Sequence, residues 1–347
     1  MTTLGKKDSA TENHTKKKYE WSVYNFKKKK KKIIITGWAG FIGSNFLNTL
    51  VPRHPEIQFL NLDLLTYAGD LTKIDDSVRN SANYAFFQID IRDKEALHDL
   101  YERAKPTDII HFAAESHVDN SIKNPRIFTE TNVIGTQNLL DLHREFGLWR
   151  FHYISTDEVY GDIPEWGFFT ESTPLHPSSP YSASKAAGDM LTSAYGRTFG
   201  IDYTITRCSN NYGPHQDHEK LIPHFIDLLK NDQPVPLYGD GSNIRDWLYV
   251  VDHCEAVWEV FTRGERGSVY NIGWNNEYTN LEITKILIAK MGKSESLIEF
   301  VADRPWHDKR YAIDATKIQR ALGWEPKVDF RDGIEKTIAF YLNEETH

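Results

Sequence analysis

The stretch IIITGWAGFIG, residues 33–43, decides the fold. Its isoleucines form an apolar, strand-like run, and Gly37, Gly40 and Gly43 follow with the spacing G-x-x-G-x-x-G before a helical run begins. Glycines in such a turn let the backbone approach a pyrophosphate closely, and the helix N-terminus favours the negative charge. The stretch predicts a dinucleotide site, although by itself the spacing also fits a purely structural glycine turn.

The sequence around this stretch alternates short apolar runs with amphipathic ones. We expect strands at residues 33–36, 57–62, 84–89, 108–112, 150–155 and 203–207, and helices at residues 41–51, 93–104, 126–146 and 180–199. Apolar runs that are continuous rather than alternating indicate strands buried on both faces. The predicted fold class is therefore α/β, with a Rossmann-type doubly wound parallel sheet and a smaller C-terminal α/β substrate lobe.

The chain divides by composition into three parts. Residues 1–32 are polar and rich in lysine, residues 33–206 form the predicted cofactor-binding Rossmann domain, and residues 207–347 form mainly a substrate domain. Further helical runs near residues 221–230, 252–263, 280–291 and 331–343 indicate an α/β lobe in this last part. Segments of the last part are also expected to return to the Rossmann sheet.

Charge is distributed unevenly along the 347 residues, whose net charge is -8. Residues 1–32 carry eleven lysines against three acidic residues, a net charge of +8, and the remaining chain holds 30 basic and 46 acidic residues. So acidic a body argues against nucleic-acid binding, which needs a basic surface. The first 32 residues are predicted to be a flexible solubilising arm, with an arm that binds nucleic acid or an acidic partner as the alternative.

Targeting signals and a disulfide framework are not evident in the sequence. The two cysteines, Cys208 and Cys254, are too few for such a framework, and the basic N-terminus lacks the apolar segment of a secretory signal. No stretch reaches the roughly 18 apolar residues of a membrane span. These features favour the cytoplasm and no membrane partner.

Polar residues at the ends of the next strands strengthen the prediction of a dinucleotide site. Asp63 ends the second strand twenty residues after Gly43, where a carboxylate binds the adenosine ribose hydroxyls and repels a 2′-phosphate, so NAD is favoured over NADP. Asp90 and Ile91 end the third strand, and residues 112–116 end the fourth. Capping of the following helices is the alternative interpretation of the two aspartates.

Tyr181 and Lys185 indicate a base for alcohol oxidation. They follow Pro180 and are four residues apart, so they lie on one face of a helix. A cation beside a phenol lowers its pKa from about 10, which would let Tyr181 deprotonate a sugar hydroxyl while hydride leaves for a nicotinamide.

The segment Thr156-Asp157-Glu158 follows the fifth strand and indicates further proton chemistry. Simple alcohol oxidation needs one hydroxyl to hold the substrate oxygen, whereas two carboxyl groups at the same place suggest an acid and a base. In a regular strand Asp157 and Glu158 would point to opposite faces, so both reach one sugar only if the chain turns out of the sheet there. A helix-capping pair is the structural alternative.

The chain from residue 32 onward resembles the extended short-chain dehydrogenase/reductase family, and within it the nucleotide-sugar dehydratases. The resemblance is carried by residues 36–46 (TGWAGFIGSNF), 112–119 (FAAESHVD), 155–161 (STDEVYG), 181–189 (YSASKAAGD), 207–214 (RCSNNYGP), 245–253 (RDWLYVVDH) and 301–314. The Thr-Asp-Glu triplet distinguishes the dehydratases from the nucleotide-sugar epimerases of the family, which have serine or threonine there without an acid–base pair.

The resemblance implies NAD-dependent dehydration of dTDP-glucose to dTDP-4-keto-6-deoxyglucose, which supplies deoxysugars such as rhamnose. Tyr181, assisted by Lys185, would take the proton of the 4-hydroxyl, and Thr156 would hold that oxygen. Glu158 would remove the proton of carbon 5 and Asp157 would protonate the departing 6-hydroxyl, which requires Asp157 to stay protonated near neutrality. A homodimer is implied as well, through helices that include the one bearing Tyr181.

The resemblance also assigns binding residues. Those expected at the cofactor are Gly37, Gly40, Phe41, Ile42, Gly43, Asp63, Leu64, Leu65, Thr66, Asp90, Ile91, Phe112, Ala113, Ala114, Ser116, Thr131, Tyr181 and Lys185. Those expected at the nucleotide-sugar substrate are Ser116, Thr156, Asn210, Lys220, Leu221, Pro236, Leu237, Tyr238, Arg245, Asn280, Asp303, Arg304, Pro305, Trp306 and His307.

Within this set Lys220 and Arg245 are the expected diphosphate partners, and Tyr238 or a nearby aromatic ring would stack on the base. Trp306 departs from the family, which usually has glycine there, so the loop's conformation and base selectivity are open. No metal is expected, because the histidines show no metal-ligand spacing. The alternatives are a 4,6-dehydratase of UDP- or CDP-glucose, an epimerase or decarboxylase, and a non-catalytic NAD-binding scaffold.

Overall fold

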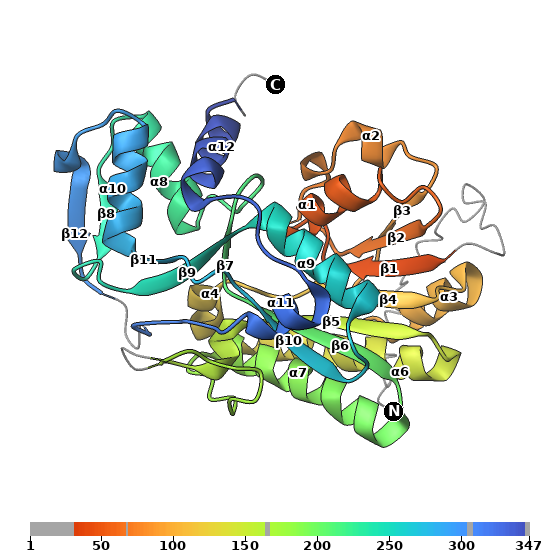
Figure 1. Cartoon of the computed structure of the whole chain (residues 1–347). Coiled ribbons are helices and arrows are strands. Elements are labelled where there is room, and N and C mark those ends of the chain that lie inside the picture. The colour runs from red at the N-terminus through yellow and green to blue at the C-terminus, as the bar shows by residue number, and fades with distance from the viewer. Residues whose placement is uncertain (1–30, 67–68, 164–166, 304–307, 344–347) are drawn as a thin grey trace, which may run out of the picture.

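A parallel seven-stranded sheet forms the centre of the larger lobe (Figure 1). The computed structural model describes residues 31–66, 69–163, 167–303 and 308–343, so the predicted arm up to residue 30 lies outside the described residues. The strand order is β10-β6-β5-β4-β1-β2-β3, and every neighbouring pair is parallel. The strands are β1 (Lys32–Thr36), β2 (Gln58–Asp63), β3 (Tyr84–Gln88), β4 (Asp108–His111), β5 (Arg150–Thr156), β6 (Asp202–Cys208) and β10 (Ser268–Ile272). The predicted doubly wound Rossmann architecture is confirmed.

Helices cover both faces of this sheet, which is why the strand sequences are continuously apolar. One face carries α1 (Phe41–Leu50), α9 (Val250–Arg263) and α11 (Thr316–Leu322), and the other carries α3 (Lys94–Ala104), α6 (Thr136–Phe146) and α7 (Pro180–Phe199) (Figure 1). Along β1, Ile33 and Ile35 pack in the cluster formed with α1 and α9, while Ile34 between them packs in the cluster formed with α3 and α6. A single strand therefore supplies two hydrophobic cores.

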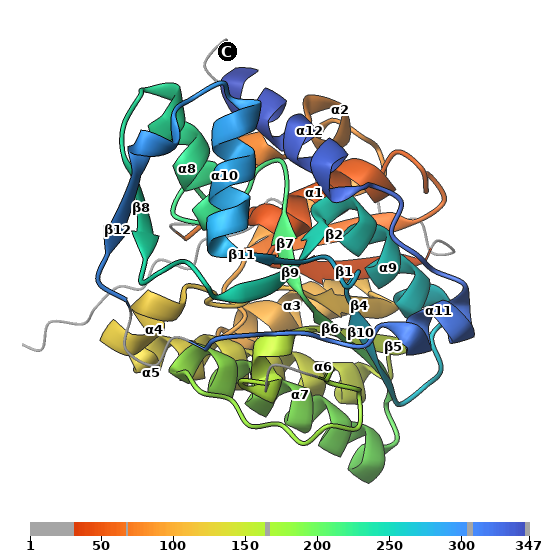
Figure 2. The ribbon, with the colours of Figure 1, turned by 60° about the vertical axis from the view of Figure 1, so that its left-hand side comes forward.

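A smaller lobe packs beside the carboxyl ends of the central strands (Figure 2). It contains a three-stranded sheet and a strand pair, made of β7 (Asn210–Tyr212), β9 (Ile244–Tyr249), β11 (Glu277–Thr279), β8 (Val235–Tyr238) and β12 (Ile298–Val301). Its helices are α8 (Leu221–Lys230), α10 (Asn280–Lys290) and α12 (Phe330–Asn343), with the short turn η5 (Glu295–Leu297). Ile226, Leu287 and Ile338 from these three helices meet in one buried cluster, so the lobe has a core of its own.

The chain passes between the two lobes more than once. After β9 it returns to the larger lobe, where α9 packs on α1 and β10 adds the seventh strand beside β6. The division of the chain at residue 207 remains a prediction. The boundary after residue 32 also remains a prediction; in the structure Lys32 is the first residue of β1, and its Nζ donates a 2.6 Å hydrogen bond to the buried carbonyl of Ala104.

Residues 126–146 differ from the single helix that the sequence predicts. The chain forms α5 (Pro125–Thr129), then a π-helical turn, η3 (Glu130–Gly135), and then α6. Inside this turn the Asn132 side chain accepts a hydrogen bond from the Glu115 amide at 2.8 Å and donates one to the Glu115 carbonyl at 3.0 Å. A π turn inside a helix commonly marks a functional site, and here it lies beside the strand end that the sequence assigns to the cofactor.

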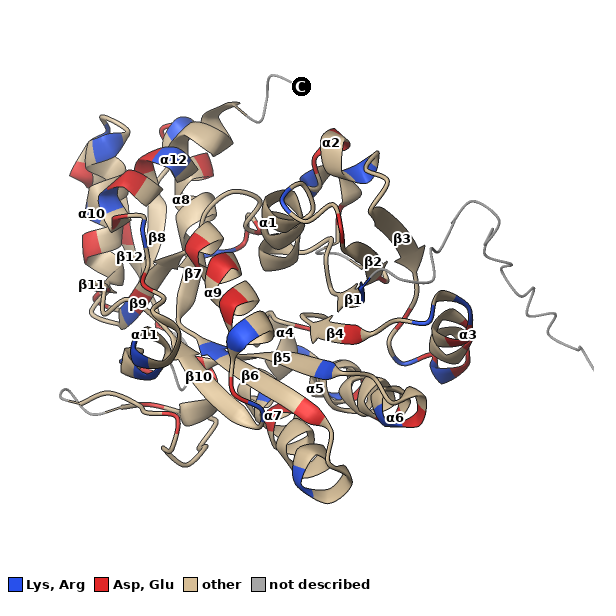
Figure 3. Ribbon diagram, turned by 45° about the vertical axis from the view of Figure 1, so that its right-hand side comes forward, with Lys and Arg blue, Asp and Glu red and all other residues tan. Residues whose placement is uncertain are grey.

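The remaining short elements connect the strands and helices of the larger lobe. They are η2 (Leu71–Lys73), α2 (Asp76–Arg79), α4 (Val118–Lys123) and η4 (Asp157–Tyr160). Acidic residues recur along α9, whereas α10 and α12 carry charges of both signs (Figure 3). Within the described ranges, none of the helices has the length and apolar character that a membrane crossing requires.

Candidate active site

The strand order creates a crevice at the carboxyl ends of β1 and β4. These two strands are neighbours, and the chain leaves β1 toward β2 on one side and β4 toward β5 on the other, so this is the switch point of the sheet. A cavity of about 410 Å³ lies there. Its lining extends from Gly37 in the glycine turn to Lys220 before α8, so both lobes contribute to it.

The glycine turn brings bare backbone to the cavity wall. Gly37 has a φ of +80°, and a Cβ atom on it would lie 2.3 Å from the Ala113 nitrogen. A Cβ atom on Gly43 would lie 2.8 Å from the Gly37 carbonyl oxygen. Gly40 is the N-cap of α1 and no side chain caps this helix, so its first amides face the cavity side of the turn. This is the cradle that a pyrophosphate requires.

Asp63 joins the end of β2 to the glycine turn. Its Oδ2 accepts a 2.8 Å hydrogen bond from the Ala39 amide and its Oδ1 accepts one of 2.8 Å from the Leu65 amide. The carboxylate lines the cavity, where the sequence places the adenosine ribose. The helix-capping alternative does not apply to it, because Asp70 caps η2, the first helical turn after β2.

Asp90 is the second aspartate of the cofactor end, and it is paired with Arg92. Arg92 Nη2 lies 2.6 Å from Asp90 Oδ2, and the Arg92 amide donates a 2.8 Å hydrogen bond to Asp90 Oδ1. Asp93 caps α3 instead, by accepting a 3.0 Å hydrogen bond from the Ala96 amide. Asp90 therefore presents a partly neutralised carboxylate to the cavity that it lines.

Nearly all residues predicted at the cofactor share this cavity. Those that line it are Gly37, Gly40, Phe41, Ile42, Gly43, Asp63, Leu64, Thr66, Asp90, Ile91, Phe112, Ala113, Ala114, Ser116, Thr131, Tyr181 and Lys185. Leu65 does not line it, and contributes its backbone amide to Asp63 instead. Thr131 reaches the cavity from the π turn, two residues after the end of α5.

The acidic pair lies where the fifth strand stops. β5 ends at Thr156, and Asp157–Tyr160 forms the 3₁₀ turn η4, whose N-cap is Thr156. The Thr156 hydroxyl accepts a 3.2 Å hydrogen bond from the Glu158 amide and donates one of 3.1 Å to Asp157 Oδ1. The chain thus turns out of the sheet, as both carboxyl groups need, and both residues line the cavity.

Burial controls the protonation of this pair. Desolvation, followed by the charge of Glu158, raises the pKa of Asp157 to about 8. Desolvation also raises the pKa of Glu158, while Lys220 and Arg245 oppose that rise. Asp157 Oδ2 is buried and has no hydrogen-bond partner among the described residues. At neutral pH Asp157 is therefore protonated, and none of the described residues forms a hydrogen bond with its Oδ2 atom.

Tyr181 and Lys185 stand on one face of α7, whose start is fixed by a capping box between Ser179 and Ser182. Lys185 Nζ donates a 2.6 Å hydrogen bond to the Ile154 carbonyl, and burial lowers its pKa to about 8. Burial, and next the charge of Glu158, raises the pKa of Tyr181 well above its ordinary value. The expected lowering by Lys185 is not seen, because desolvation and nearby carboxylates outweigh it.

The residues predicted at the substrate fall into three groups. Ser116, Thr156, Asn210 and Lys220 line the cavity. Leu221, Pro236, Leu237, Tyr238, Arg245, Asn280 and Asp303 do not line it, and all but Asp303 belong to α8, β8, β9 and α10 of the smaller lobe. The remaining four, Arg304, Pro305, Trp306 and His307, lie outside the described residues. Leu237 is fully buried in the core of its lobe, so its side chain serves packing.

Arg245 is adjacent to the acidic pair rather than in the cavity wall. Its Nη2 donates a 2.9 Å hydrogen bond to the Asp308 carbonyl, and its Nη1 donates one of 2.7 Å to the Ile244 carbonyl. Its guanidinium lies 4.4 Å from the centre of the Tyr311 ring. Its positive charge nevertheless acts to lower the pKa of Asp157 and of Glu158.

Several cavity residues were not singled out from the sequence. His117 lines the cavity and its Nε2 lies 2.9 Å from Glu219 Oε2, which joins the end of β4 to the loop before α8. Gln216 and Cys208 also line it. His117 lies within the motif at residues 112–119, so the motif carried a signal for it. Among the residues described, there is no cluster of three or more metal-ligand side chains.

The comparisons with known proteins agree with this site. The sequence model of the family described as GDP-mannose 4,6 dehydratase matches residues 34–337. The chain belongs to this family. It lies within the extended short-chain dehydrogenases/reductases, as the motifs implied.

Two relatives within the family bear on the chemistry. The dTDP-glucose 4,6-dehydratase of Neisseria gonorrhoeae is 46% identical over 338 residues, which cover 91% of this chain and 97% of that protein. The crystal structure of DesIV, a dTDP-glucose 4,6-dehydratase from Streptomyces venezuelae with NAD and TYD bound, has a TM-score of 0.87 and 46% identity. The alignment covers 91% of this chain and 98% of that one.

An epimerase shares the fold at lower identity. The UDP-glucose 4-epimerase of Thermus thermophilus, solved with NAD, has a TM-score of 0.83 and 32% identity, and the alignment covers 90% of this chain and 99% of that one. The architecture therefore serves more than one reaction, and the side chains at the cavity must decide between them.

Proposed function

We propose that this chain is a hydro-lyase that converts dTDP-glucose into dTDP-4-keto-6-deoxyglucose with NAD as its cofactor. The observation that carries the proposal is the pair of the buried Asp157 and the half-buried Glu158 in the same cavity as Tyr181 and Lys185. Oxidation alone needs only the tyrosine and lysine, whereas removal of water needs an additional acid and base. Relatives named dTDP-glucose 4,6-dehydratase at 44–46% identity support the same assignment.

The glycine turn and Asp63 fit NAD. The missing Cβ atoms at Gly37 and Gly43 let the turn pack against the Ala113 backbone and against itself, so that its backbone lines the cavity where a pyrophosphate would bind. The Asp63 carboxylate suits two free ribose hydroxyls but repels a 2′-phosphate. When bound, NAD would supply a hydride acceptor for carbon 4 and then a hydride donor for carbon 6, while carbon 5 takes up a proton. Lys185, one helical turn after Tyr181, would supply positive charge that opposes the effect of burial on the phenol.

The chain's own residues divide the proton transfers. Tyr181 accepts the proton of the sugar's 4-hydroxyl, and Thr156 holds the same oxygen. The resulting ketone makes the proton on carbon 5 acidic, and Glu158 removes it. Asp157, protonated because burial raises its pKa to about 8, donates a proton to the departing 6-hydroxyl, which leaves as water.

Substrate binding rests on a few polar residues at the lobe boundary. We propose that Ser116 and Asn210 bind the sugar and that Lys220 and Arg245 face its diphosphate, since both cations act on the acidic pair electrostatically. The base-binding side is proposed to lie toward β8 and α10, with Leu221, Pro236, Leu237, Tyr238 and Asn280, and toward residues 303–307. This is the least defined part of the site, so UDP- and CDP-glucose are the alternative substrates.

The assembly and setting belong to the same proposal. Met190 on α7 is large and apolar, yet it is 62% exposed. We propose that the face of α7 around Met190 joins two copies in a homodimer. The enzyme would act in the cytoplasm, without nucleic-acid or membrane partners, and would supply deoxysugar pathways such as that of dTDP-rhamnose.

Incubation with dTDP-, UDP- or CDP-glucose, without added NADH, tests the proposed function. We expect the 4-keto-6-deoxy sugar to form fastest from dTDP-glucose, because the relatives are named for it. Formation of a 4-epimer without loss of water would favour an epimerase, and the absence of a 4-keto-6-deoxy sugar from all three would contradict the dehydratase proposal. A variant that replaces Tyr181 with phenylalanine is the matched negative control, because it removes only the reacting oxygen.

A further inference from the structure

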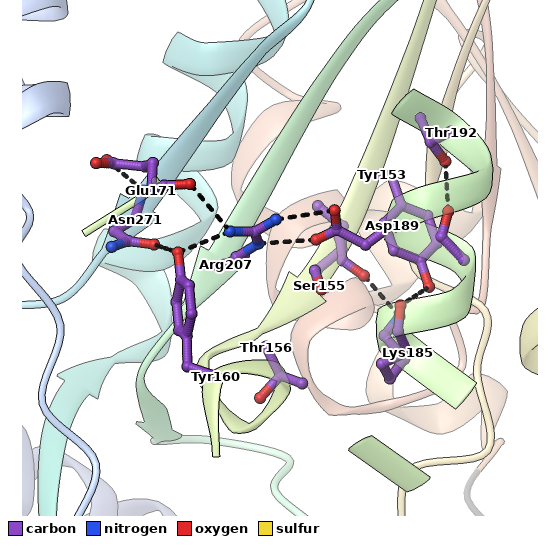
Figure 4. Close-up of polar contacts among 12 residues, drawn as sticks. Tyr153, Ser155, Thr156, Tyr160, Glu171, Lys185, Asp189, Thr192, Arg207 and Asn271 are labelled. Carbon is purple, nitrogen blue, oxygen red and sulfur yellow. Dashed lines mark hydrogen bonds and ion pairs between the residues drawn. The ribbon is translucent and has the colours of Figure 1, made fainter. Parts of the chain in front are cut away.

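A buried polar network behind the cavity is centred on Arg207 of β6 (Figure 4). The Nε and Nη2 atoms of Arg207 donate hydrogen bonds of 2.8 and 2.9 Å to the two carboxylate oxygens of Asp189. Its Nη1 donates a 2.8 Å hydrogen bond to the hydroxyl of Tyr160. All three side chains are buried, and none of them lines the cavity. The network therefore does not touch a ligand there.

Arg207 connects two elements that carry different parts of the catalytic group. Asp189 lies on α7, four residues after Lys185 and eight after Tyr181, so the three residues share one side of the helix. Tyr160 is the last residue of η4, the turn that begins at Asp157. The guanidinium thus bridges the helix with the phenol and the turn with the two carboxyl groups.

The direction of each hydrogen bond in the network is fixed. Arginine has only donors, so the Tyr160 oxygen must accept from Arg207 and use its own proton elsewhere. It donates that proton to Asn271 Oδ1 of β10 at 2.8 Å. Asn271 Nδ2 in turn donates to the Phe169 carbonyl at 2.9 Å, and the Phe169 ring stacks on the Tyr160 ring with centres 4.9 Å apart. Tyr160 is therefore held at its oxygen and at its ring.

Lysine cannot replace arginine at this position without loss of hydrogen bonds. The fork of Arg207 satisfies both oxygens of a buried carboxylate and still has a third donor for Tyr160, whereas an ammonium group is a point charge without that planar geometry. Reacting groups misplaced by about 1 Å can lose on the order of a hundredfold in rate. Because the Arg207 fork has a single geometry, it is suited to holding η4 in a fixed position relative to α7.

We propose that Arg207, through Tyr160, is a positioning residue that holds the Asp157–Glu158 turn in register with Tyr181 and Lys185. The inference rests on the proposed dehydratase function. Oxidation of carbon 4 uses groups on α7 and Thr156 of β5. Elimination follows it on the same sugar and needs η4 in place as well. Loosening the bond between Arg207 and Tyr160 therefore slows elimination more than oxidation.

Replacement of Tyr160 with phenylalanine tests the positioning role. The variant keeps the ring and its stacking but loses the oxygen that Arg207 and Asn271 share. In a single turnover with dTDP-glucose, reduced cofactor rises during oxidation and falls after elimination. We expect an unchanged rise and a fall that is slower by about tenfold. Arg207→Lys should slow the fall as well, and because it also weakens the contact to Asp189 it should slow the rise.

A matched control is Tyr270→Phe. Tyr270 is a buried tyrosine that precedes Asn271 on β10, and its hydroxyl accepts a 3.0 Å hydrogen bond from the Glu265 amide, away from the cavity. A merely structural role for Tyr160 would lower the active fraction in both variants and scale the two phases equally.

Three outcomes separate the possibilities. A slower fall in Tyr160→Phe but not in Tyr270→Phe supports the positioning role. Equal slowing of both phases, or no change in either, with normal turnover by the unaltered protein, overturns this inference alone. If the unaltered protein forms no 4-keto-6-deoxy sugar, the proposed function fails and the inference fails with it.

Discussion

At the residue scale, we propose that the two carboxyl groups after β5 have opposite roles, Asp157 as the acid and Glu158 as the base. Asp157→Asn removes the acid but leaves the base, so we expect oxidation at carbon 4 to continue while loss of water slows by about a hundredfold or more. Reduced cofactor should then accumulate, and carbon 5 should still exchange its hydrogen with deuterated water through Glu158. Glu158→Gln is the matched variant and should abolish that exchange. Loss of oxidation in Asp157→Asn would contradict the division of roles.

The raised pKa of Asp157 also has a consequence for stability. Its value of about 8 in the folded chain exceeds the roughly 3.9 of an unfolded aspartate, so the folded state binds more protons between these values and loses stability as pH rises through them. Asp157→Asn should therefore unfold at a higher temperature than the unaltered chain, with a difference in the free energy of unfolding that grows by roughly 4 kcal/mol from pH 5 to about pH 8. Thermal unfolding at several pH values measures it.

The control for that measurement is Asp76→Asn, because the side chain of Asp76 is 81% exposed on the surface. Its difference from the unaltered chain should stay nearly constant over the same pH range. A difference that shrinks with rising pH in Asp157→Asn would show that the carboxyl group is not destabilised by burial.

Sequence reasoning proposed the catalytic residues and predicted a protonated Asp157, but it predicted the wrong direction for the pKa of Tyr181. Tyr181, Lys185 and the acidic pair could be found because each belongs to a motif with a fixed spacing. The direction of the pKa shift of Tyr181 could not be predicted, since it depends on how deeply the phenol is buried and on which carboxylates face it. Both are properties of the packed structure.

At the element scale, the glycine turn between β1 and α1 is held by contact with the end of β4. Gly37→Ala would force a side chain into a positive-φ residue and against the Ala113 backbone. We expect NAD affinity to fall by at least about tenfold and the free energy of unfolding to fall by roughly 1–3 kcal/mol. Gly147→Ala is the control, because Gly147 also has a positive φ but meets nothing within 4 Å. Its NAD affinity should be unchanged, and titration of bound NAD measures both variants.

The π turn before α6 shows where element prediction stops. Residues 126–146 have a helical pattern, and one helix is the simplest interpretation. The extra residue in the turn is set by side chains far apart in sequence, because Asn132 binds the Glu115 backbone and donates a 2.8 Å hydrogen bond to Ser184 of α7. No local sequence pattern indicates such contacts. A turn after β5, by contrast, was expected if Asp157 and Glu158 were both to reach one sugar, and the structure has η4 there.

At the scale of the whole molecule, the acidic body must bind two diphosphate ligands. Residues 33–347 carry 16 more acidic than basic residues, so the long-range field repels dTDP-glucose and recognition depends on local donors and cations. We expect the association rate of dTDP-glucose to rise by about twofold between low and physiological salt, because screening weakens the repulsion. Stopped-flow measurement with uncharged thymidine as control tests this. A steep fall with salt would instead indicate attractive steering.

The parallel, doubly wound type of the central sheet could be predicted from alternating strands and helices, but the place where the chain returns to this sheet could not. In the sequence β10 lies in the part that is assigned mainly to the substrate domain, yet in the structure it pairs with β6 as the seventh strand of the central sheet. Such pairing depends on which edge remains open once both lobes have formed, and that is decided by long-range packing of α9 on α1.

We propose that one bound cofactor takes the hydrogen of carbon 4 and that the same hydrogen returns to carbon 6. Incubation with dTDP-glucose carrying deuterium at carbon 4, in ordinary water, tests this transfer. We expect a 4-keto-6-deoxy product with the deuterium at carbon 6. Recovery of the deuterium at carbon 4 of a 4-epimer, or its release into water, would contradict it.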